Sequence, residues 1–214
     1  MSQLHYITRP SSLKENAPLL IMCHGYGSDE NDLFSFASEL PEELFIISLR
    51  APYTIQPYGN AWYAINFDAD KGKWNDAVQA KSSVELISDF ISYACNTYAI
   101  NSENVTLLGF SQGTILSYAV ALNHPKKVKN IIALSGYIYE DILPDTINKS
   151  DVTHLNFFCS HGSADQVIPV DWARKTPNFL DELGINNTYS EYPVGHGVDP
   201  QNFYNLKTWL ENYI

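Results

Sequence analysis

The segment Gly109-Phe110-Ser111-Gln112-Gly113 places a serine between two glycines, directly after an apolar run. A serine here is a turn residue, a helix cap or a nucleophile on a sharp bend between a strand and a helix. Such a bend needs glycines because side chains two residues to either side would collide. It exposes the hydroxyl at the start of a helix, where the dipole and free N–H groups favour developing negative charge. On its own this motif is weak evidence for a nucleophile. The residues that would activate the serine must be sought elsewhere in the chain.

A serine nucleophile needs a base to accept its proton and an acid to orient that base. One known arrangement of such a bend has the chain order serine, acid, histidine. Asp165 follows the apolar run 155–162, and His196 follows the run 187–193. Each residue therefore lies just beyond an expected strand and in the required order. We expect His196 to be the base and Asp165 to be the residue that orients it.

Other acidic residues and histidines fit these roles less well. His161 precedes Asp165 and ends its own strand, so we expect it to shape the loop. Asp199 follows His196, and Asp171 is expected to open a helix. The remaining histidines considered lie near no strand end: His5, His124 and His154.

An ester-cleaving serine also needs donors for the oxyanion. One is expected to be the backbone N–H of Gln112, the residue after the serine. The other is expected from an earlier loop, and Tyr26 lies in His24-Gly25-Tyr26-Gly27 after an apolar run. His24 could be a metal ligand, but no second ligand follows at a zinc-site spacing. We therefore expect neither a metal nor a cofactor.

The elements that would position these residues alternate along the chain. Short segments, most of them apolar, predict strands at 17–25, 44–52, 104–110, 129–137, 155–162 and 187–193, with an added antiparallel edge strand at 4–8. Helical spacing predicts helices at 29–40, 78–98, 112–123, 171–183 and 201–213, with Gly184 as a cap and Pro200 at a helix start. The alternation predicts an α/β fold with a mostly parallel central sheet flanked by helices on both faces. Ligands on such sheets bind at the carboxyl ends of the strands.

Composition narrows the classes of partner. The 214 residues are 45% hydrophobic and 17% charged, which favours one folded domain over residues 1–214. The net charge of −11, with no basic cluster larger than 126–129, argues against nucleic acid and anionic membranes. No apolar run approaches ~18 residues, so stable membrane insertion is not expected. The first ten residues lack a signal-peptide pattern, and the three cysteines lack metal spacing, so we expect a cytoplasmic protein.

Four blocks in order carry a family resemblance: HGYGSDENDL, GFSQGT, HGSADQVIPV and GHGV. Shorter matches are LRAP at 49–52, AWY at 61–63 and LSGY at 134–137. Together they resemble the phospholipase/carboxylesterase family of α/β-hydrolases, which includes acyl-protein thioesterases and small bacterial carboxylesterases. The resemblance implies the α/β-hydrolase fold, with Ser111, Asp165 and His196 as the catalytic residues. It also implies Tyr26 and Gln112 as oxyanion donors.

Two departures concern the substrate. Tyr26 is followed by Gly-Ser-Asp, where many thioesterase-like members have leucine followed by Gly-Asp. The polar segment 66–76, which contains Phe67 and Trp74, is either a lid over the acyl pocket or a surface loop. Four further residues either line that pocket or belong to the core: Trp62, Tyr63, Tyr137 and Ile168.

We expect a serine hydrolase that cleaves small-molecule carboxylic esters of short to medium acyl length through an acyl-enzyme, as a monomer or homodimer. An acyl-protein thioesterase or a lysophospholipase would use the same machinery. A catalytically silent binding protein on the same scaffold is the alternative outside the enzymes. Such proteins usually lack a member of the triad, and this sequence has all three candidates.

Overall fold

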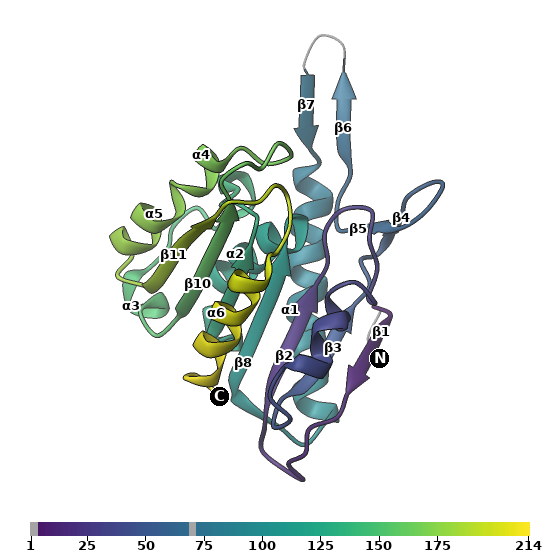
Figure 1. Cartoon of the computed structure of the whole chain (residues 1–214), viewed down its shortest axis with the longest axis vertical. Coiled ribbons are helices and arrows are strands. Elements are labelled where there is room, and N and C mark those ends of the chain that lie inside the picture. The colour runs from purple at the N-terminus through teal and green to yellow at the C-terminus, as the bar shows by residue number, and fades with distance from the viewer. Residues whose placement is uncertain (1–3, 69–71) are drawn as a thin grey trace.

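A computed structural model describes residues 4–68 and 72–214 (Figure 1). Its strands are β1 (Tyr6–Arg9), β2 (Ala17–Cys23), β3 (Phe45–Leu49), β4 (Tyr53–Thr54), β5 (Asn60–Ala61), β6 (Ile65–Asp68), β7 (Gly72–Asn75), β8 (Ile100–Phe110), β9 (Asn130–Leu134), β10 (Asn156–Gly162) and β11 (Asn186–Tyr192). The α-helices are α1 (Ala77–Thr97), α2 (Gln112–Asn123), α3 (Lys149–Val152), α4 (Val170–Ala173), α5 (Thr176–Glu182) and α6 (Pro200–Glu211). Short 3₁₀ helices are η1 (Leu33–Glu39), η2 (Pro125–Lys127) and η3 (Glu140–Ile142).

Within the described residues, seven strands form the central sheet in the order β1-β3-β2-β8-β9-β10-β11. Neighbouring strands run parallel from β3 to β11, and β1 pairs antiparallel with β3 at one edge. This is the mostly parallel sheet that the alternating pattern predicts, including the antiparallel edge strand. The parallel strands therefore bring their carboxyl ends, and the loops that follow them, to one edge of the sheet.

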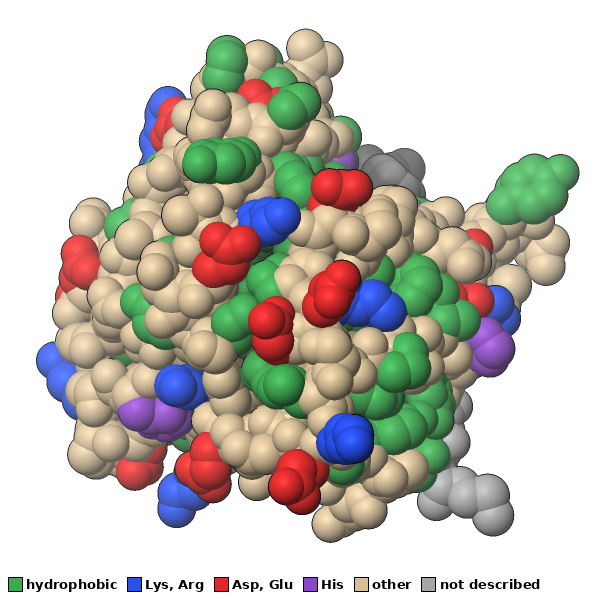
Figure 2. Space-filling model, turned by 60° about the horizontal axis from the view of Figure 1, so that its bottom comes forward, with side chains coloured by type: hydrophobic (Ala, Val, Ile, Leu, Met, Phe, Trp, Pro, Cys, Tyr) green, Lys and Arg blue, Asp and Glu red, His purple; other side chains and the backbone are tan. Residues whose placement is uncertain are grey.

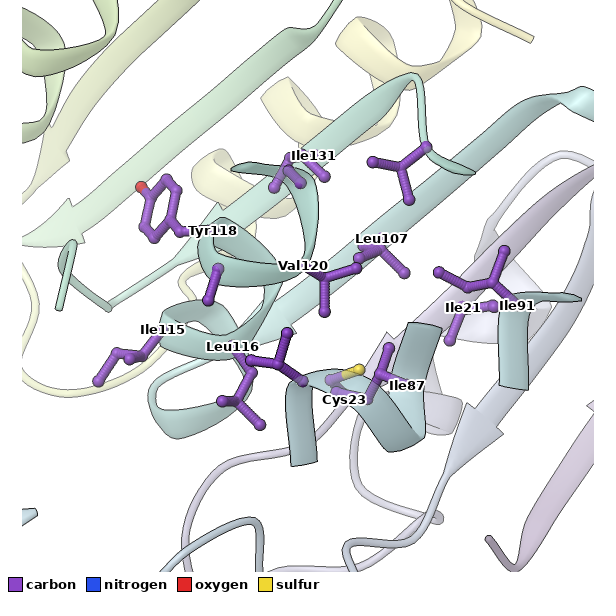
Figure 3. Close-up of a cluster of buried hydrophobic side chains, with 14 of the residues drawn as sticks. Ile21, Cys23, Ile87, Ile91, Leu107, Ile115, Leu116, Tyr118, Val120 and Ile131 are labelled. Carbon is purple, nitrogen blue, oxygen red and sulfur yellow. The ribbon is translucent and has the colours of Figure 1, made fainter. Parts of the chain in front are cut away.

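Helices cover both faces of this sheet, as Figure 1 shows. β2 is buried along its whole length, and its alternate side chains point to opposite faces. On one face, Leu20 and Met22 belong to the cluster that contains Leu206 and Leu210 of α6. On the other face, Ile21 belongs to a larger cluster with side chains of α1 and α2, shown in Figure 3.

The two helices next to the turn between β8 and α2, here called the elbow, differ in their exposure. Residues 112–122 of α2 are all buried, because this helix lies against the sheet and is covered by α1. α1 has one buried face and begins at Asp76, whose carboxylate accepts a hydrogen bond from the backbone N–H of Gln79. The rigid environment of α2 fixes the position of the residue at its N-terminus.

Two helix predictions need correction. The segment 29–40 forms only the 3₁₀ helix η1, preceded by turns in which the Asp29 side chain accepts from the backbone N–H of Asn31. Such side-chain bonds to the local backbone compete with helix formation. The segment 171–183 is divided between α4 and α5, because Pro177 lacks an N–H and therefore sits in the first turn of a new helix.

Two small sheets lie outside the predicted elements. β4 pairs with β5, and β6 pairs with β7 in a hairpin that projects beyond the central sheet (Figure 1). Among the described residues, no helix is long and apolar enough to span a membrane.

Candidate active site

Ser111 lies on the sharp turn between β8 and α2. Its backbone has φ 53° and ψ −114°, a strained conformation for a residue with a side chain. A methyl group at Gly113 would lie 1.9 Å from the carbonyl oxygen of Cys23, and one at Gly109 would lie 2.5 Å from the backbone nitrogen of Thr114. Both glycines are therefore required by close contacts, as the motif predicts.

The Ser111 hydroxyl does not cap the helix that follows it. Ser111 makes no side-chain hydrogen bond to the N-terminus of α2, although it occupies the cap position. Its Oγ instead lies 2.9 Å from Nε2 of His196. This contact argues against the two structural alternatives that the sequence allows, an ordinary turn serine and a helix cap.

His196 joins Ser111 to Asp165. Nδ1 of His196 lies 2.6 Å from Oδ2 of Asp165, so in the neutral tautomer Nδ1–H donates to the carboxylate and Nε2 accepts from Ser111. The Asp165 side chain is fully buried, while 17% of the His196 side chain is exposed. The His196 ring also packs against Phe110, with 4.9 Å between the ring centroids. The three side chains form a continuous hydrogen-bonded chain.

The Asp165 carboxylate is held in its ionised form. Burial alone would raise the pKa of this carboxyl group, but the hydrogen bond from His196 and those from two backbone N–H groups lower it below its usual value. The backbone donors are Val167, at 2.8 Å, and Ile168, at 2.9 Å, and both bind Oδ1. An ionised carboxylate in this position favours the protonated form of the imidazole that it contacts.

His161 supports the same carboxylate from the buried side. Its Nε2 lies 2.9 Å from the carbonyl oxygen of Ile168 and 3.3 Å from Oδ2 of Asp165. Nε2–H therefore donates within the loop that holds Asp165, which agrees with the loop-shaping role expected for His161. The sequence showed that His161 ends a strand but gave no sign that its ring contacts the aspartate.

His24 fixes the loop that contains Tyr26. The His24 ring is fully buried, and its Nε2 accepts from the backbone N–H of Ala51 at 3.0 Å while Nδ1–H donates to the carbonyl of Gly25 at 2.7 Å. Burial lowers the pKa of His24, so the ring is neutral. A methyl group at Gly25 would lie 3.3 Å from Cβ of Ser111, which shows how closely this loop approaches the serine.

The two backbone N–H groups expected as oxyanion donors, those of Tyr26 and Gln112, have no backbone acceptor among the described residues. The N–H of Gln112 belongs to the first residue of α2, where an α-helix offers no internal acceptor. Among the described residues, no backbone acceptor binds the N–H of Tyr26, whereas its neighbour Gly27 donates to Asn60. The Gln112 side chain has a second role that the sequence did not reveal. Its Oε1 accepts from the N–H of Trp62 and its Nε2 donates to the carbonyl of Tyr63, both at 2.8 Å.

A cavity of about 580 Å³ opens beside Ser111 and His196. Of the four residues considered for the pocket wall, Tyr63, Tyr137 and Ile168 line this cavity. Trp62 does not, and that assignment is corrected: its side chain is fully buried and its Nε1–H donates to the carbonyl of His24 at 2.9 Å. Trp62 therefore supports the loop of Tyr26 from behind, because the indole needs a hydrogen-bond acceptor in the core.

The end of the β6–β7 hairpin that is nearest the central sheet forms part of the cavity wall. Ile65 and Asn75, which pair across the β6–β7 hairpin, both line the cavity, and Nδ2 of Asn75 donates to the Tyr137 hydroxyl at 2.9 Å. Residues 69–71 of the segment 66–76, and the side chains of 67–74, lie outside what the structure describes, so the choice between a lid and a surface loop stays a prediction.

Among the residues that the structure describes, no group of three His, Cys, Asp or Glu side chains could hold a metal ion. The three cysteines are free thiols, and burial raises the pKa of Cys23 and of Cys159 to about 12, so neither is a thiolate at neutral pH.

The central sheet, the strand-turn-helix elbow and the loops at the carboxyl ends of β2, β10 and β11 define the α/β-hydrolase fold. Solved structures share it across nearly the whole chain. The structure of esterase PE8 matches with a TM-score of 0.80 at 21% identity and covers 99% of each chain. The Bacillus cereus carboxylesterase matches with a TM-score of 0.82 at 17% identity and covers 100% of this chain and 96% of its own.

Sequence comparison gives the family. The phospholipase/carboxylesterase family matches residues 7–214, and the chain belongs to this family of carboxylic ester hydrolases. Acyl-protein thioesterase 1 of Candida albicans is 25% identical over 212 residues, which are 91% of each chain. A probable carboxylesterase of rice is 29% identical over 117 residues, and the match spans 54% of this chain and less than half, 44%, of the rice protein.

Proposed function

We propose that this chain hydrolyses small-molecule carboxylic esters of short to medium acyl length through an acyl-enzyme on Ser111. The observation that carries the proposal is the hydrogen-bonded chain from Ser111 Oγ to His196 Nε2, at 2.9 Å, and from His196 Nδ1 to Asp165 Oδ2, at 2.6 Å. His196 lies within hydrogen-bond reach of both Ser111 and Asp165, which is the geometry that an activated serine requires of its base and orienting acid.

In the first half-reaction, Ser111 Oγ attacks the ester carbonyl carbon and its proton passes to Nε2 of His196. The backbone N–H groups of Tyr26 and Gln112 stabilise the tetrahedral oxyanion. Removing one such donor costs about 2.7–4 kcal/mol in a measured case. The intermediate collapses, the C–O bond of the ester breaks, and His196 protonates the leaving alkoxide. Asp165 stabilises the transient imidazolium.

In the second half-reaction, water attacks the acyl-serine while His196 accepts its proton. The second oxyanion collapses, the acid leaves, and His196 returns the proton to Ser111. No step requires a cofactor. The wall formed by Tyr63, Tyr137 and Ile168 would hold the substrate beside Ser111 in the 580 Å³ cavity, a volume suited to a small ligand.

Thioester hydrolysis is the second candidate, because the match to acyl-protein thioesterase 1 of Candida albicans covers 91% of each chain. A thiolate leaving group would use the same proton from His196. Lysophospholipid hydrolysis shares the machinery as well. Rates on p-nitrophenyl butyrate, butyryl-coenzyme A and a long-chain lysophospholipid separate the three activities, and we expect the short-chain ester to be cleaved fastest.

The remaining features of the proposal concern the whole molecule. We propose one domain over residues 1–214, active as a monomer or homodimer without nucleic acid, in the cytoplasm. The three free thiols fit a reducing compartment. On the face in Figure 2, Lys and Arg side chains are interspersed with Asp and Glu, and they form no continuous basic area there.

The test uses Ser111→Ala with Ser117→Ala as the matched control, because Ser117 lies on α2, the helix that Ser111 precedes, and donates to the carbonyl of Gly113. Wild type and control are expected to react with a fluorophosphonate probe that peptide mapping locates on Ser111. Ser111→Ala should lose both labelling and turnover of p-nitrophenyl butyrate. Retained turnover in Ser111→Ala would overturn the proposal, and absent labelling in wild type would favour a silent binding protein.

A further inference from the structure

The wall of the cavity beside Ser111 combines several aromatic side chains with a carboxylate. The aromatic lining residues are Tyr26, Tyr63, Tyr137, Tyr139 and Trp172, and the carboxylate is that of Asp141. A pocket for an unbranched acyl chain needs only apolar side chains, so the carboxylate and the phenol groups call for another explanation.

Asp141 has no lysine or arginine beside it in the described part of the cavity wall. Lys175 lines a neighbouring hollow of about 330 Å³, together with Glu140. The two hollows share Tyr137, Tyr139 and Trp172, and the rings of Tyr137 and Trp172 meet edge to face with 5.0 Å between centroids.

The fold fixes Asp141 in this position. It is the middle residue of η3, and the next residue, Ile142, is buried against the core. Nδ2 of Asn123, on α2, donates to the carbonyl of Ile142 at 3.0 Å and to that of Ala119 at 2.8 Å. The Asp141 side chain next to this anchored residue is exposed to solvent and lines the cavity.

The phenols of Tyr137 and Tyr139 have raised pKa values beside this carboxylate. Burial, and then the adjacent Asp141 carboxylate, raise the pKa of Tyr139 to about 12. Burial is also the main cause that raises the pKa of Tyr137, whose hydroxyl accepts from Nδ2 of Asn75 at 2.9 Å. The wall therefore offers neutral aromatic faces next to one anionic group.

Aromatic faces with a nearby carboxylate bind organic cations, because a ring attracts a cation to its face and a desolvated alkylammonium group fits between rings. An anionic group in the same cavity would approach Asp141 without a described counterion. The net charge of −11 also attracts cations to the molecule. We propose that this cavity is a subsite for the ammonium group of cationic esters and that Asp141 determines the specificity for them. This inference rests on the ester hydrolysis proposed above.

The ammonium group could belong to the alcohol or to the acid of the ester, and matched substrates separate these sources. Butyrylcholine carries the cation on the alcohol, and its neutral isostere is 3,3-dimethylbutyl butyrate. Glycine betaine ethyl ester carries it on the acid, and its neutral isostere is ethyl 3,3-dimethylbutyrate. For each pair, the measured quantity is the ratio of kcat/KM for the cationic ester to that for the neutral ester.

Asp141→Asn keeps the shape of the side chain and removes its charge. We expect it to lower the ratio about tenfold for the pair whose cation reaches the subsite. The matched control is Glu140→Gln, which removes a neighbouring carboxylate that lines the other hollow, and it should keep the wild-type ratio. Trp172→Leu should also lower the ratio because it removes an aromatic face, whereas Trp172→Phe should retain most of it.

A binding measurement tests the same subsite without a cationic substrate. Tetramethylammonium chloride is expected to inhibit the hydrolysis of p-nitrophenyl butyrate competitively, compared with sodium chloride at equal ionic strength, and more weakly in Asp141→Asn. An unchanged ratio for both pairs in Asp141→Asn, or equal inhibition by the two salts, would overturn the subsite. Fluorophosphonate labelling of Ser111 distinguishes that result from failure of the proposed hydrolysis, since labelling persists if only the subsite is wrong.

Discussion

Ser111 and His196 both lie between glycines, but the two pairs of glycines do different things. A methyl group at Gly113 would lie 1.9 Å from the carbonyl oxygen of Cys23, so the elbow admits no side chain there. At Gly197 a methyl group would have no described atom within 4 Å, and at Gly195 the nearest would be 3.9 Å away. The same residue type therefore reflects a close contact in one loop and open space in the other.

This difference shows how each side chain is positioned. The backbone places Ser111, since α2 is buried and its first turn packs against the ends of β2 and β8. Side-chain contacts place His196 instead, namely its bonds to Asp165 and Ser111 and the Phe110 ring. Glycine substitutions should therefore disturb the elbow, while loss of a polar partner should disturb the histidine loop.

The largest expected effect concerns the partner of His196. Asp165→Asn should reduce kcat by about 10⁴-fold, as the corresponding change does in a serine protease, because the amide favours the wrong histidine tautomer. KM on p-nitrophenyl butyrate should change far less. Steady-state kinetics at neutral pH measure both constants.

A circular-dichroism spectrum and a urea melt serve as controls for that variant. The near-ultraviolet spectrum should match wild type, since asparagine has nearly the same shape. A kcat within tenfold of wild type in a folded Asp165→Asn would show that the bond to Asp165 does not position His196. The contrast between a serine placed by the backbone and a histidine placed by side-chain contacts would then be wrong.

The second effect tests the elbow. Gly113→Ala should lower the free energy of unfolding by about 3 kcal/mol or more, because overpacking at a backbone contact forces α2 away from β2. The urea midpoint measures this loss. A stable Gly113→Ala that retains full activity would show that the elbow relaxes easily, contrary to the contact distances.

The sequence predicts many of the strands and helices, and the residues that meet at Ser111, for physical reasons. Buried parallel strands have unbroken apolar runs, so 17–25 predicts β2 closely, and α2 occupies the predicted range 112–123. Chain order and strand ends then suffice to select Asp165 and His196, which the structure brings together with Ser111.

The missed features depend on long-range contacts. The amide of Gln112 binds the backbone of residues 62 and 63, about fifty positions away, and no local pattern signals that contact. Trp62 looked like a pocket residue because aromatic side chains occupy cores and pockets alike. The hairpin of β6 and β7 was missed because its strands are short and polar. Pro177 was present in the sequence and could have divided the predicted helix 171–183.

A smaller effect concerns acid stability. Hydrogen bonds from His196 and two backbone N–H groups outweigh burial and lower the pKa of Asp165 below its unfolded value. A depressed pKa in the folded state stabilises the protein above the unfolded pKa, ~3.9, and this stabilisation is lost as the pH falls through the folded pKa. Between neutral pH and about pH 3, wild type should therefore lose more stability than Asp165→Asn. Urea unfolding across this range measures the difference, and parallel curves would contradict the assigned bonds.

The smallest effect is expected at Gly197. Its φ is not positive, and a methyl group would enter open space, so Gly197→Ala should change the free energy of unfolding by no more than about 0.5 kcal/mol. With His196 positioned by its polar partners, kcat/KM should stay close to wild type. A folded Gly197→Ala with slow turnover would mean that this glycine provides backbone motion during catalysis. In that case the two glycine pairs would differ in dynamics as well as in packing, and His196 would depend on its own loop as Ser111 depends on its elbow.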